Sequence, residues 1–73
     1  MDVYGRVARL FLDLAEEEEG VLVIQQKLTQ QDIANRIGAS REMVARIMKE
    51  LIKGGYIHQQ GGTLIINESL SQS

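Results

Sequence analysis

The chain has 73 residues, with eight Lys and Arg against ten Asp and Glu, and it contains neither cysteine nor proline. This length allows one small domain, which excludes a two-domain cleft and a cofactor-binding α/β sheet. The lack of cysteine excludes a disulfide scaffold and a cysteine zinc site, and no apolar run approaches the roughly 20 residues of a membrane span. Taken alone, the net charge of −2 argues against a nucleic-acid partner.

Charge is divided unevenly along the chain. Residues 1–20 carry two basic and six acidic side chains, a net charge of −4, whereas residues 21–63 carry six basic and three acidic side chains, a net charge of +3. Such an asymmetry is typical of proteins that meet a charged partner. A nucleic acid therefore remains open as the partner of the basic stretch.

The first predicted element is a helix over roughly residues 2–17, in a segment that spans 1–19. Apolar residues recur there at helical period from Val3 to Leu14. The glutamates Glu16–Glu19 would then lie at the negative end of the helix dipole, where we expect fraying. This acidic run is either a docking patch or a solvated helix end.

A short apolar run, Val21–Ile24, predicts a strand after this helix. The sequence Thr29-Gln30-Gln31-Asp32 is a capping-box pattern with Asp in place of Glu. A second helix is therefore expected to begin near Gln30 and to end at Gly38, which supplies a left-handed residue.

Only Ala39 and Ser40 separate Gly38 from the next predicted helix, and Ser40 is a good N-cap. Two helices joined by a short turn that contains glycine form a helix-turn-helix, here over residues 29–54. At 100° per residue, the third helix, Arg41–Lys53, has an apolar half and a half that carries every charge, four of them basic. The apolar half comprises Met43, Val44, Ile47, Met48, Leu51 and Ile52.

The remaining elements are predicted to be a hairpin and a tail. The runs 56–60 and 63–66 flank Gly61-Gly62, which predicts a β-hairpin over residues 56–66, followed by a polar tail over 67–73. The fold class is thus mainly α with a small β component, a winged helix-turn-helix of three helices and a β-hairpin wing in one domain of residues 1–73.

Catalysis is not expected from these residues. The chain has one histidine, His58, in the predicted hairpin, where a surface role is usual, and it has no acid–histidine–nucleophile set. The glycine pairs are turn glycines that match no phosphate-binding loop, and no residues stand at metal-ligand spacing. We therefore expect no enzyme, no metal and no cofactor site in this domain.

The predicted third helix is the candidate DNA reader, because the second helix of a helix-turn-helix enters the major groove and its N-terminal residues reach base edges. Arg41, Glu42 and Arg46 offer a hydrogen-bond donor, an acceptor and a donor, which suits a site that contains G·C pairs. The alternatives are that this charged face is only solvated, or that the domain is a winged-helix protein-interaction module without specific DNA binding.

Phosphate contacts are expected at the helix starts and along the charged face. Thr29, Gln30 and Ser40 lie where side chains and free backbone amides suit phosphate oxygens. Lys49 and Lys53 lie further along the third helix and add positive charge.

The sequence resembles the C-terminal DNA-binding domain of the cyclic-AMP receptor protein and fumarate–nitrate regulator (CRP/FNR) family. The resemblance lies in residues 29–34 and 38–49, above all in the Ser-Arg-Glu-x-Val-x-Arg run from Ser40 to Arg46. Residues 2–8 are similar to the helix that joins the family's sensor domain to its DNA-binding domain, and 56–63 to its wing.

The resemblance assigns roles to individual residues. Arg41-Glu42 followed by Ala45-Arg46 is similar to the receptor-protein branch, which reads TGTGA-like half-sites, and implies base contacts by Arg41, Glu42 and Arg46. Met43 stands where a phosphate-contacting Thr is usual, and Gly62 where a basic wing residue is usual, so we expect fewer phosphate contacts. The implied phosphate contacts are Thr29, Gln31, Ser40 and Lys49.

The resemblance also implies a larger context. Members of the family are bacterial, cytoplasmic transcription regulators that bind palindromic double-stranded DNA as homodimers, with RNA polymerase as a further partner and no membrane association. A cyclic nucleotide or other effector binds a sensor domain that precedes the DNA-binding domain. Because Met1 directly abuts the hinge-like segment, we expect a fragment of such a regulator.

Overall fold

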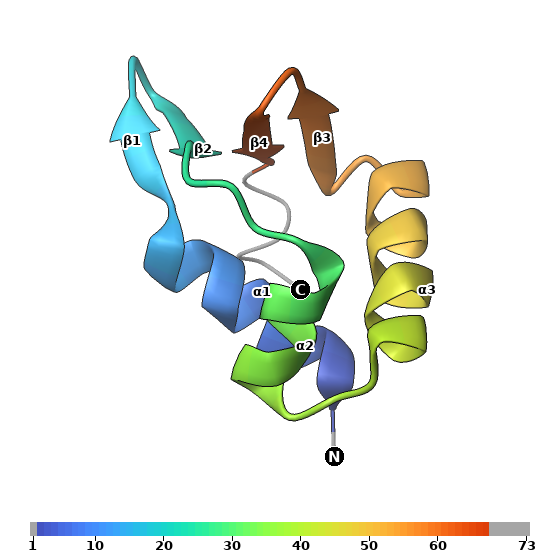
Figure 1. Ribbon diagram of the computed structural model, residues 1–73. Coiled ribbons are helices and arrows are strands. Elements are labelled where there is room, and N and C mark those ends of the chain that lie inside the picture. Colours follow the sequence, from blue (N-terminus) through green and yellow to red (C-terminus); the bar gives the residue numbers. More distant parts are fainter. Residues whose placement is uncertain (1, 68–73) are drawn as a thin grey trace.

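The computed structural model describes residues 2–67, which form three helices and four strands (Figure 1). The predicted winged helix-turn-helix is confirmed, whereas of the predicted tail over 67–73 only Asn67 lies within the described residues. The elements in chain order are α1 (Val3–Leu14), β1 (Glu16–Glu18), β2 (Val21–Ile24), α2 (Gln30–Ile37), α3 (Arg41–Lys53), β3 (Ile57–Gln60) and β4 (Thr63–Ile66).

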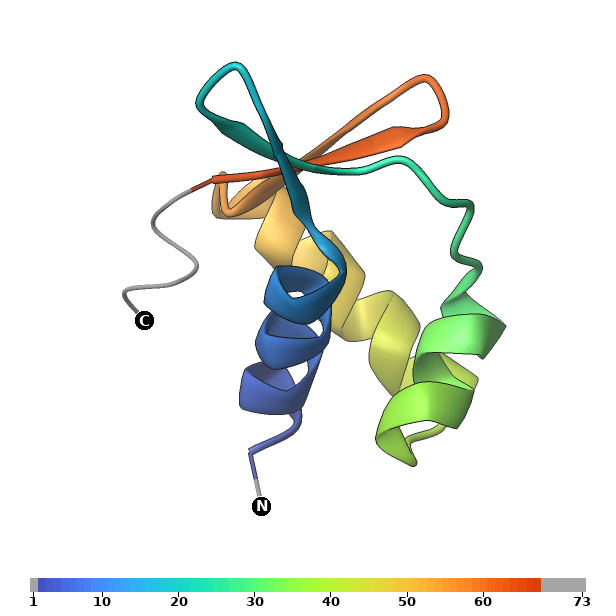
Figure 2. The ribbon, with the colours of Figure 1, turned by 90° about the vertical axis from the view of Figure 1, so that its left-hand side faces the viewer.

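The four strands form one antiparallel sheet in the order β1-β2-β4-β3. The central pair joins segments far apart in the chain, with Leu22 opposite Ile66 and Ile24 opposite Leu64. The sheet lies above the three helices, and the tips of its two hairpins diverge (Figure 2). The predicted wing is thus one half of a larger sheet.

The acidic segment departs from the prediction, because α1 ends at Leu14 and Glu16–Glu18 form a strand. A longer helix would have placed four carboxylates at the negative end of its dipole. Instead, Glu19 (φ +52°) and Gly20 (φ +80°) both adopt left-handed conformations, which suit a two-residue hairpin turn, and the chain folds back so that Glu18 pairs with Val21. The helix predicted to reach residue 17, and the helical segment 1–19, are therefore wrong beyond Leu14.

The core is apolar and lies where the helices meet the sheet. None of the described residues with a polar or charged side chain is buried, so packing of hydrocarbon side chains holds the domain together. The buried residues are Val7, Phe11, Val23, Ile24, Ile33, Ala34, Ile37, Val44, Ile47, Met48, Leu51, Ile57 and Ile66.

The apolar half predicted for α3 is confirmed at its centre and wrong at its edges. Val44, Ile47, Met48 and Leu51 are buried. Met43 and Ile52 are 40% and 41% exposed, because they lie at opposite ends of the apolar arc, where the helix surface turns toward solvent. The charged side chains on the opposite face of α3 are all exposed to solvent.

Candidate nucleic-acid interface

The turn between α2 and α3 has the length and conformation that the sequence predicts. Gly38 ends α2 with φ +74°, and its N–H and that of Ala39 donate to the Ala34 carbonyl at 2.9 and 3.0 Å. A side chain in this left-handed conformation would strain the backbone, so glycine suits the position. The two helices are consequently held in a tight helix-turn-helix.

The start of α2 is fixed by the predicted capping box. The Thr29 Oγ accepts a hydrogen bond from the Asp32 backbone N–H at 3.0 Å, and the Asp32 Oδ2 accepts from the Thr29 N–H at 3.0 Å. Both side chains are exposed. The Thr29 oxygen is the acceptor in this cap, and its hydroxyl proton can be donated to the Asp32 carboxylate or, in a complex with DNA, to a phosphate oxygen.

Asp32 makes the stability of this capping box depend on pH. The hydrogen bond from the Thr29 backbone lowers the pKa of the Asp32 carboxyl most, followed by the Thr29 side chain, and the nearby Arg36 adds to the shift. A carboxyl whose pKa is lower in the folded than in the unfolded state stabilises the fold above its unfolded pKa.

We therefore expect this contribution to be present at neutral pH and to disappear as the pH falls below about 4. Chemical unfolding of the wild type and of Asp32→Asn from pH 7 to pH 2 tests it. The stability difference between the two proteins should shrink on acidification, and a difference that stays constant would refute the link. The isosteric variant keeps the side-chain shape while removing the titrating group.

The first turn of α3 is fixed in the same way as that of α2. The Ser40 Oγ accepts from the Met43 backbone N–H at 3.2 Å and, like Thr29, retains its hydroxyl proton as a donor. Arg41 and Glu42 follow at once, and Arg46 lies one turn later. All three charged side chains are exposed on the side opposite the buried residues of α3.

The glutamines at the start of α2 differ in their surroundings. Gln31 donates from Nε2 to the Asn35 Oδ1 at 2.9 Å, so part of its amide is engaged within the helix. Gln30 instead lines a hollow of about 290 Å³ together with Lys49 of α3 and Gln59 of β3. Two of the predicted phosphate contacts, Gln30 and Lys49, therefore border the same hollow, together with a wing residue that the sequence did not single out.

Lys27 is a second residue that the sequence did not single out. It lines a hollow of about 210 Å³ with Gly61, Gly62 and Thr63 at the wing tip. The wing itself carries no lysine or arginine, and Lys27 supplies a positive charge beside it from the segment that precedes α2. Only the strand pairing β2–β4 brings these positions together, so no local sequence pattern could have found them.

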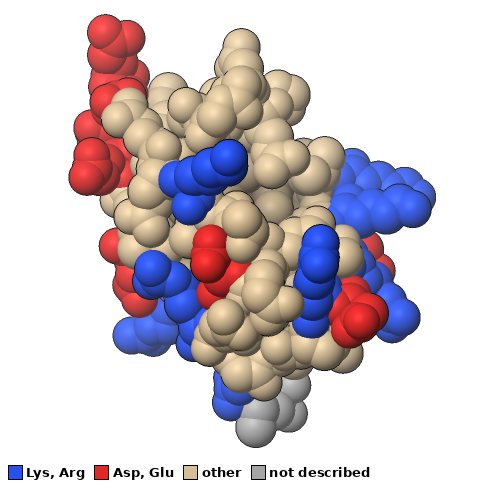
Figure 3. All heavy atoms as spheres, viewed as in Figure 1, with Lys and Arg blue, Asp and Glu red and all other residues tan. Residues whose placement is uncertain are grey.

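The most acidic part of the surface is the β1–β2 hairpin. Figure 3 shows acidic side chains gathered over this hairpin, whereas basic side chains project from the α3 side and also lie below the hairpin, with acidic side chains among those near α3. The glutamates of β1 are exposed. The hairpin that carries them lies on the opposite side of the domain from α3 (Figure 1), so these carboxylates are remote from the candidate DNA-reading face.

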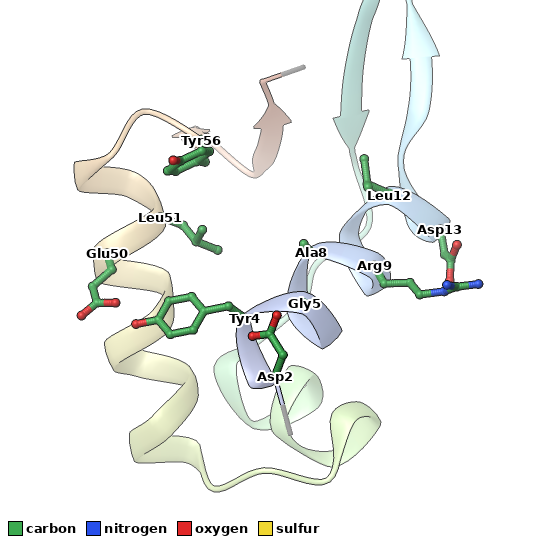
Figure 4. Close-up of a pocket in the computed structure, with 10 residues that line it drawn as sticks. All are labelled: Asp2, Tyr4, Gly5, Ala8, Arg9, Leu12, Asp13, Glu50, Leu51 and Tyr56. Atoms are coloured by element: carbon green, nitrogen blue, oxygen red, sulfur yellow. The ribbon is translucent and has the colours of Figure 1, made fainter. Parts of the chain in front are cut away.

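A further groove lies between α1 and α3 and has a volume of about 690 Å³ (Figure 4). Its apolar lining includes Ala8, Leu12 and Leu51, and the rings of Tyr4 and Tyr56 flank it. It contains none of the predicted DNA contacts. Within residues 2–67, no group of three His, Cys, Asp or Glu side chains is placed to hold a metal ion, and no helix is long and apolar enough to cross a membrane.

Curated proteins from several bacteria resemble the chain over most of its length. The cAMP-activated global transcriptional regulator Vfr of Pseudomonas aeruginosa is 41% identical over 69 residues, which are 90% of this chain and 32% of Vfr. A CRP-like cAMP-activated global transcriptional regulator of Mycobacterium tuberculosis is 39% identical over 72 residues, 93% of this chain and 32% of that protein. The chain therefore spans about a third of these curated relatives.

Solved structures also match nearly the whole of this chain, and they match it with only part of their own length. The reduced CO-sensing protein from R. rubrum superimposes with a TM-score of 0.79 at 35% identity, over 97% of this chain and 34% of that one. A CRP/FNR-family transcriptional regulator from Thermus thermophilus gives a TM-score of 0.73 at 28% identity, over 100% of this chain and 42% of that one.

The fold and the exposed recognition helix define a winged helix-turn-helix domain of the DNA-binding class. The sequence model of the Crp-like helix-turn-helix domain matches residues 5–69, and the chain belongs to this family. It is thus a DNA-binding domain of the kind found in CRP-type transcription regulators, which are not enzymes.

Proposed function

We propose that α3 enters the major groove of double-stranded DNA and reads a TGTGA-like half-site with Arg41, Glu42 and Arg46. The observation that carries the proposal is the N-terminal part of α3, which is capped by Ser40. Arg41 and Glu42 in its first turn and Arg46 one turn later extend into solvent, while the opposite face of the helix is buried. In a helix-turn-helix, this end of the second helix is the part that approaches base edges.

The chemistry of the three side chains fits such a half-site. An arginine guanidinium donates two hydrogen bonds to O6 and N7 of a guanine, and a glutamate accepts one from the amino group of a cytosine. A TGTGA half-site offers two guanines on one strand and their paired cytosines on the other. Each of the two arginines can therefore donate to one guanine, and Glu42 can accept a hydrogen bond from one of the paired cytosines.

Contacts to the DNA backbone would hold the domain in register. Both helix starts offer hydroxyl donors, from Thr29 and Ser40, beside unpaired backbone amides. Gln30, Gln31 and Lys49 are exposed and add side-chain donors. Lys27 adds a cation beside the wing tip, where the wing has no lysine or arginine.

In a longer regulator, DNA binding by this domain would be combined with effector binding and dimerisation. Relatives named as cAMP-activated support a cyclic nucleotide as the effector, bound by a part of the regulator outside these 73 residues. We further infer a homodimer that binds two half-sites about 34 Å apart, and contact with RNA polymerase, in the bacterial cytoplasm. Two linked domains would bind far more tightly than one.

Titration of the domain with a TGTGA-type duplex and with a scrambled duplex, each at two salt concentrations, tests the proposal. We expect the specific duplex to bind at least about tenfold more tightly, which is less than a dimer on a complete site achieves. Both affinities should fall as salt rises. Equal affinities for the two duplexes would contradict specific readout, and no binding to either would favour a protein-interaction module.

Lys49→Ala should weaken binding to both duplexes to the same extent, because a phosphate contact carries no sequence information. The slope of log affinity against log salt should decrease by about 1. Arg9→Ala removes the same charge from the α1–α3 groove and serves as the control, with a smaller change in slope. A loss for Lys49→Ala that is confined to the specific duplex would make Lys49 a base contact instead.

A further inference from the structure

We propose that Arg6 is a positioning residue for DNA recognition, which ties α1 to the turn of the helix-turn-helix and thereby sets the placement of the base-reading end of α3. The inference rests on the proposed function, since it concerns how Arg41 and Glu42 reach the bases. Arg6 acts through the turn and makes no contact with DNA itself.

The contact is a hydrogen bond between elements that are far apart in the chain. The Arg6 Nη1 donates to the Ile37 carbonyl oxygen at 3.1 Å, across 31 residues. Ile37 is the last residue of α2, and its carbonyl is one of the four that a helix leaves without a partner inside the helix. The guanidinium also lies at the negative end of the α2 dipole, where a cation is favourable.

The position of this carbonyl matters because the turn is so short. Only Gly38, Ala39 and Ser40 separate Ile37 from Arg41. The bonds from Gly38 and Ala39 back to α2, and the Ser40 cap of α3, hold the turn to the two helices that it joins. The Arg6 hydrogen bond ties the same turn to a third helix, α1. A shift of α1 would therefore displace the turn and, with it, the first turn of α3.

Arg6 can be removed without dismantling the core. Its side chain is exposed, whereas its helix neighbours Val7 and Phe11 are fully buried and anchor α1. Loss of the hydrogen bond should therefore leave the domain folded and free the turn to shift. Hydrogen bonds to base edges require tight geometry, whereas attraction to phosphates tolerates displacement, so specific binding should suffer more than non-specific binding.

Arg6→Met tests the proposal, with Arg9→Met as the matched control. Both changes keep an apolar stem and remove one charge from an exposed position on α1, but only Arg6 donates to Ile37. For Arg6→Met we expect the ratio of specific to scrambled affinity to fall about three- to tenfold. For Arg9→Met that ratio should stay unchanged.

A spectroscopic readout without DNA completes the test. The amide resonances of Gly38, Ala39 and Arg41 should shift in Arg6→Met and stay in place in Arg9→Met. An affinity ratio in Arg6→Met equal to that of the wild type, or turn amides that do not shift, would each overturn the positioning role. A melting temperature lowered by more than about 10 °C would also overturn it, because Arg6 would then support the whole fold.

Failure of the proposed function would look different from failure of this inference. If the wild-type domain did not distinguish the two duplexes, specific readout would be wrong, and the turn amides would still decide whether Arg6 holds the turn. If the wild type discriminated and Arg6→Met did so equally well, only the inference would fall.

Discussion

Replacement of Arg41 by alanine is expected to weaken binding to a TGTGA-type duplex by about 1–3 kcal/mol and to reduce discrimination against a scrambled duplex. The guanidinium is exposed in the first turn of α3, and its loss removes a pair of hydrogen bonds to a guanine. Fluorescence anisotropy with both duplexes measures the effect. An unchanged ratio of the two affinities would show that Arg41 does not read bases.

A change in the DNA sharpens this experiment. A duplex with 7-deazaguanine at the guanine read by Arg41 lacks the N7 acceptor. If the contact is direct, the losses caused by Arg41→Ala and by the modified base should not add when they are combined. Additive losses would mean that the two groups act separately. The same design applies to Arg46 at the second guanine.

Ile47→Ala is expected to lower the free energy of unfolding by about 2–5 kcal/mol. Ile47 is 0% exposed at the centre of the buried face of α3, so truncation loses buried hydrocarbon and leaves a cavity. The free energy of unfolding of a domain of this size is small, so a loss of this magnitude should leave the variant largely unfolded at ambient temperature. Thermal and urea unfolding followed by circular dichroism measure the loss.

Ile52→Ala is the matched control for this prediction. It makes the same substitution on the same helix at a residue that is 41% exposed, and we expect a change within about 0.5 kcal/mol. The burial of Ile47 and the exposure of Ile52 would be contradicted if both variants lost a similar amount of unfolding free energy, or if both kept the stability of the wild type.

The helix-turn-helix could be predicted closely because its signals are local. Thr29 and Asp32 mark the start of α2, Gly38 its end, and Ser40 the start of α3, and each acts through hydrogen bonds or backbone conformation within a few residues. The residues predicted to contact DNA are all exposed for a related reason. The caps and the 3.6-residue period together determine which side chains a helix turns outward.

The four-stranded sheet could not be predicted, because its pairings join distant segments. Glu16–Glu18 look unlike a strand, and they form one only because Glu19 and Gly20 turn the chain and β2 offers an edge. β2 in turn pairs with β4, about 40 residues further along the chain. Strand formation of this kind depends on neighbours in space more than on intrinsic preference.

The same limit explains the contacts that the sequence did not indicate. Lys27 lies at the wing tip and Gln59 lies beside Gln30 and Lys49 only once the sheet has formed. The hydrogen bond from Arg6 to Ile37 depends on how α1 packs against α2. Periodicity identifies Arg6 as a solvent-facing residue, and it says nothing about which carbonyl its guanidinium reaches.

The most direct test of the placement of α3 is to follow the backbone amide resonances of the labelled domain during titration with a TGTGA-type duplex. The largest changes are expected at residues 29–31 and 40–49, with smaller changes at Lys27 and the wing tip and none at Glu16–Glu18 beyond those seen with a scrambled duplex. Changes centred on the β1–β2 hairpin or on the groove between α1 and α3 would contradict the placement of α3 in the major groove.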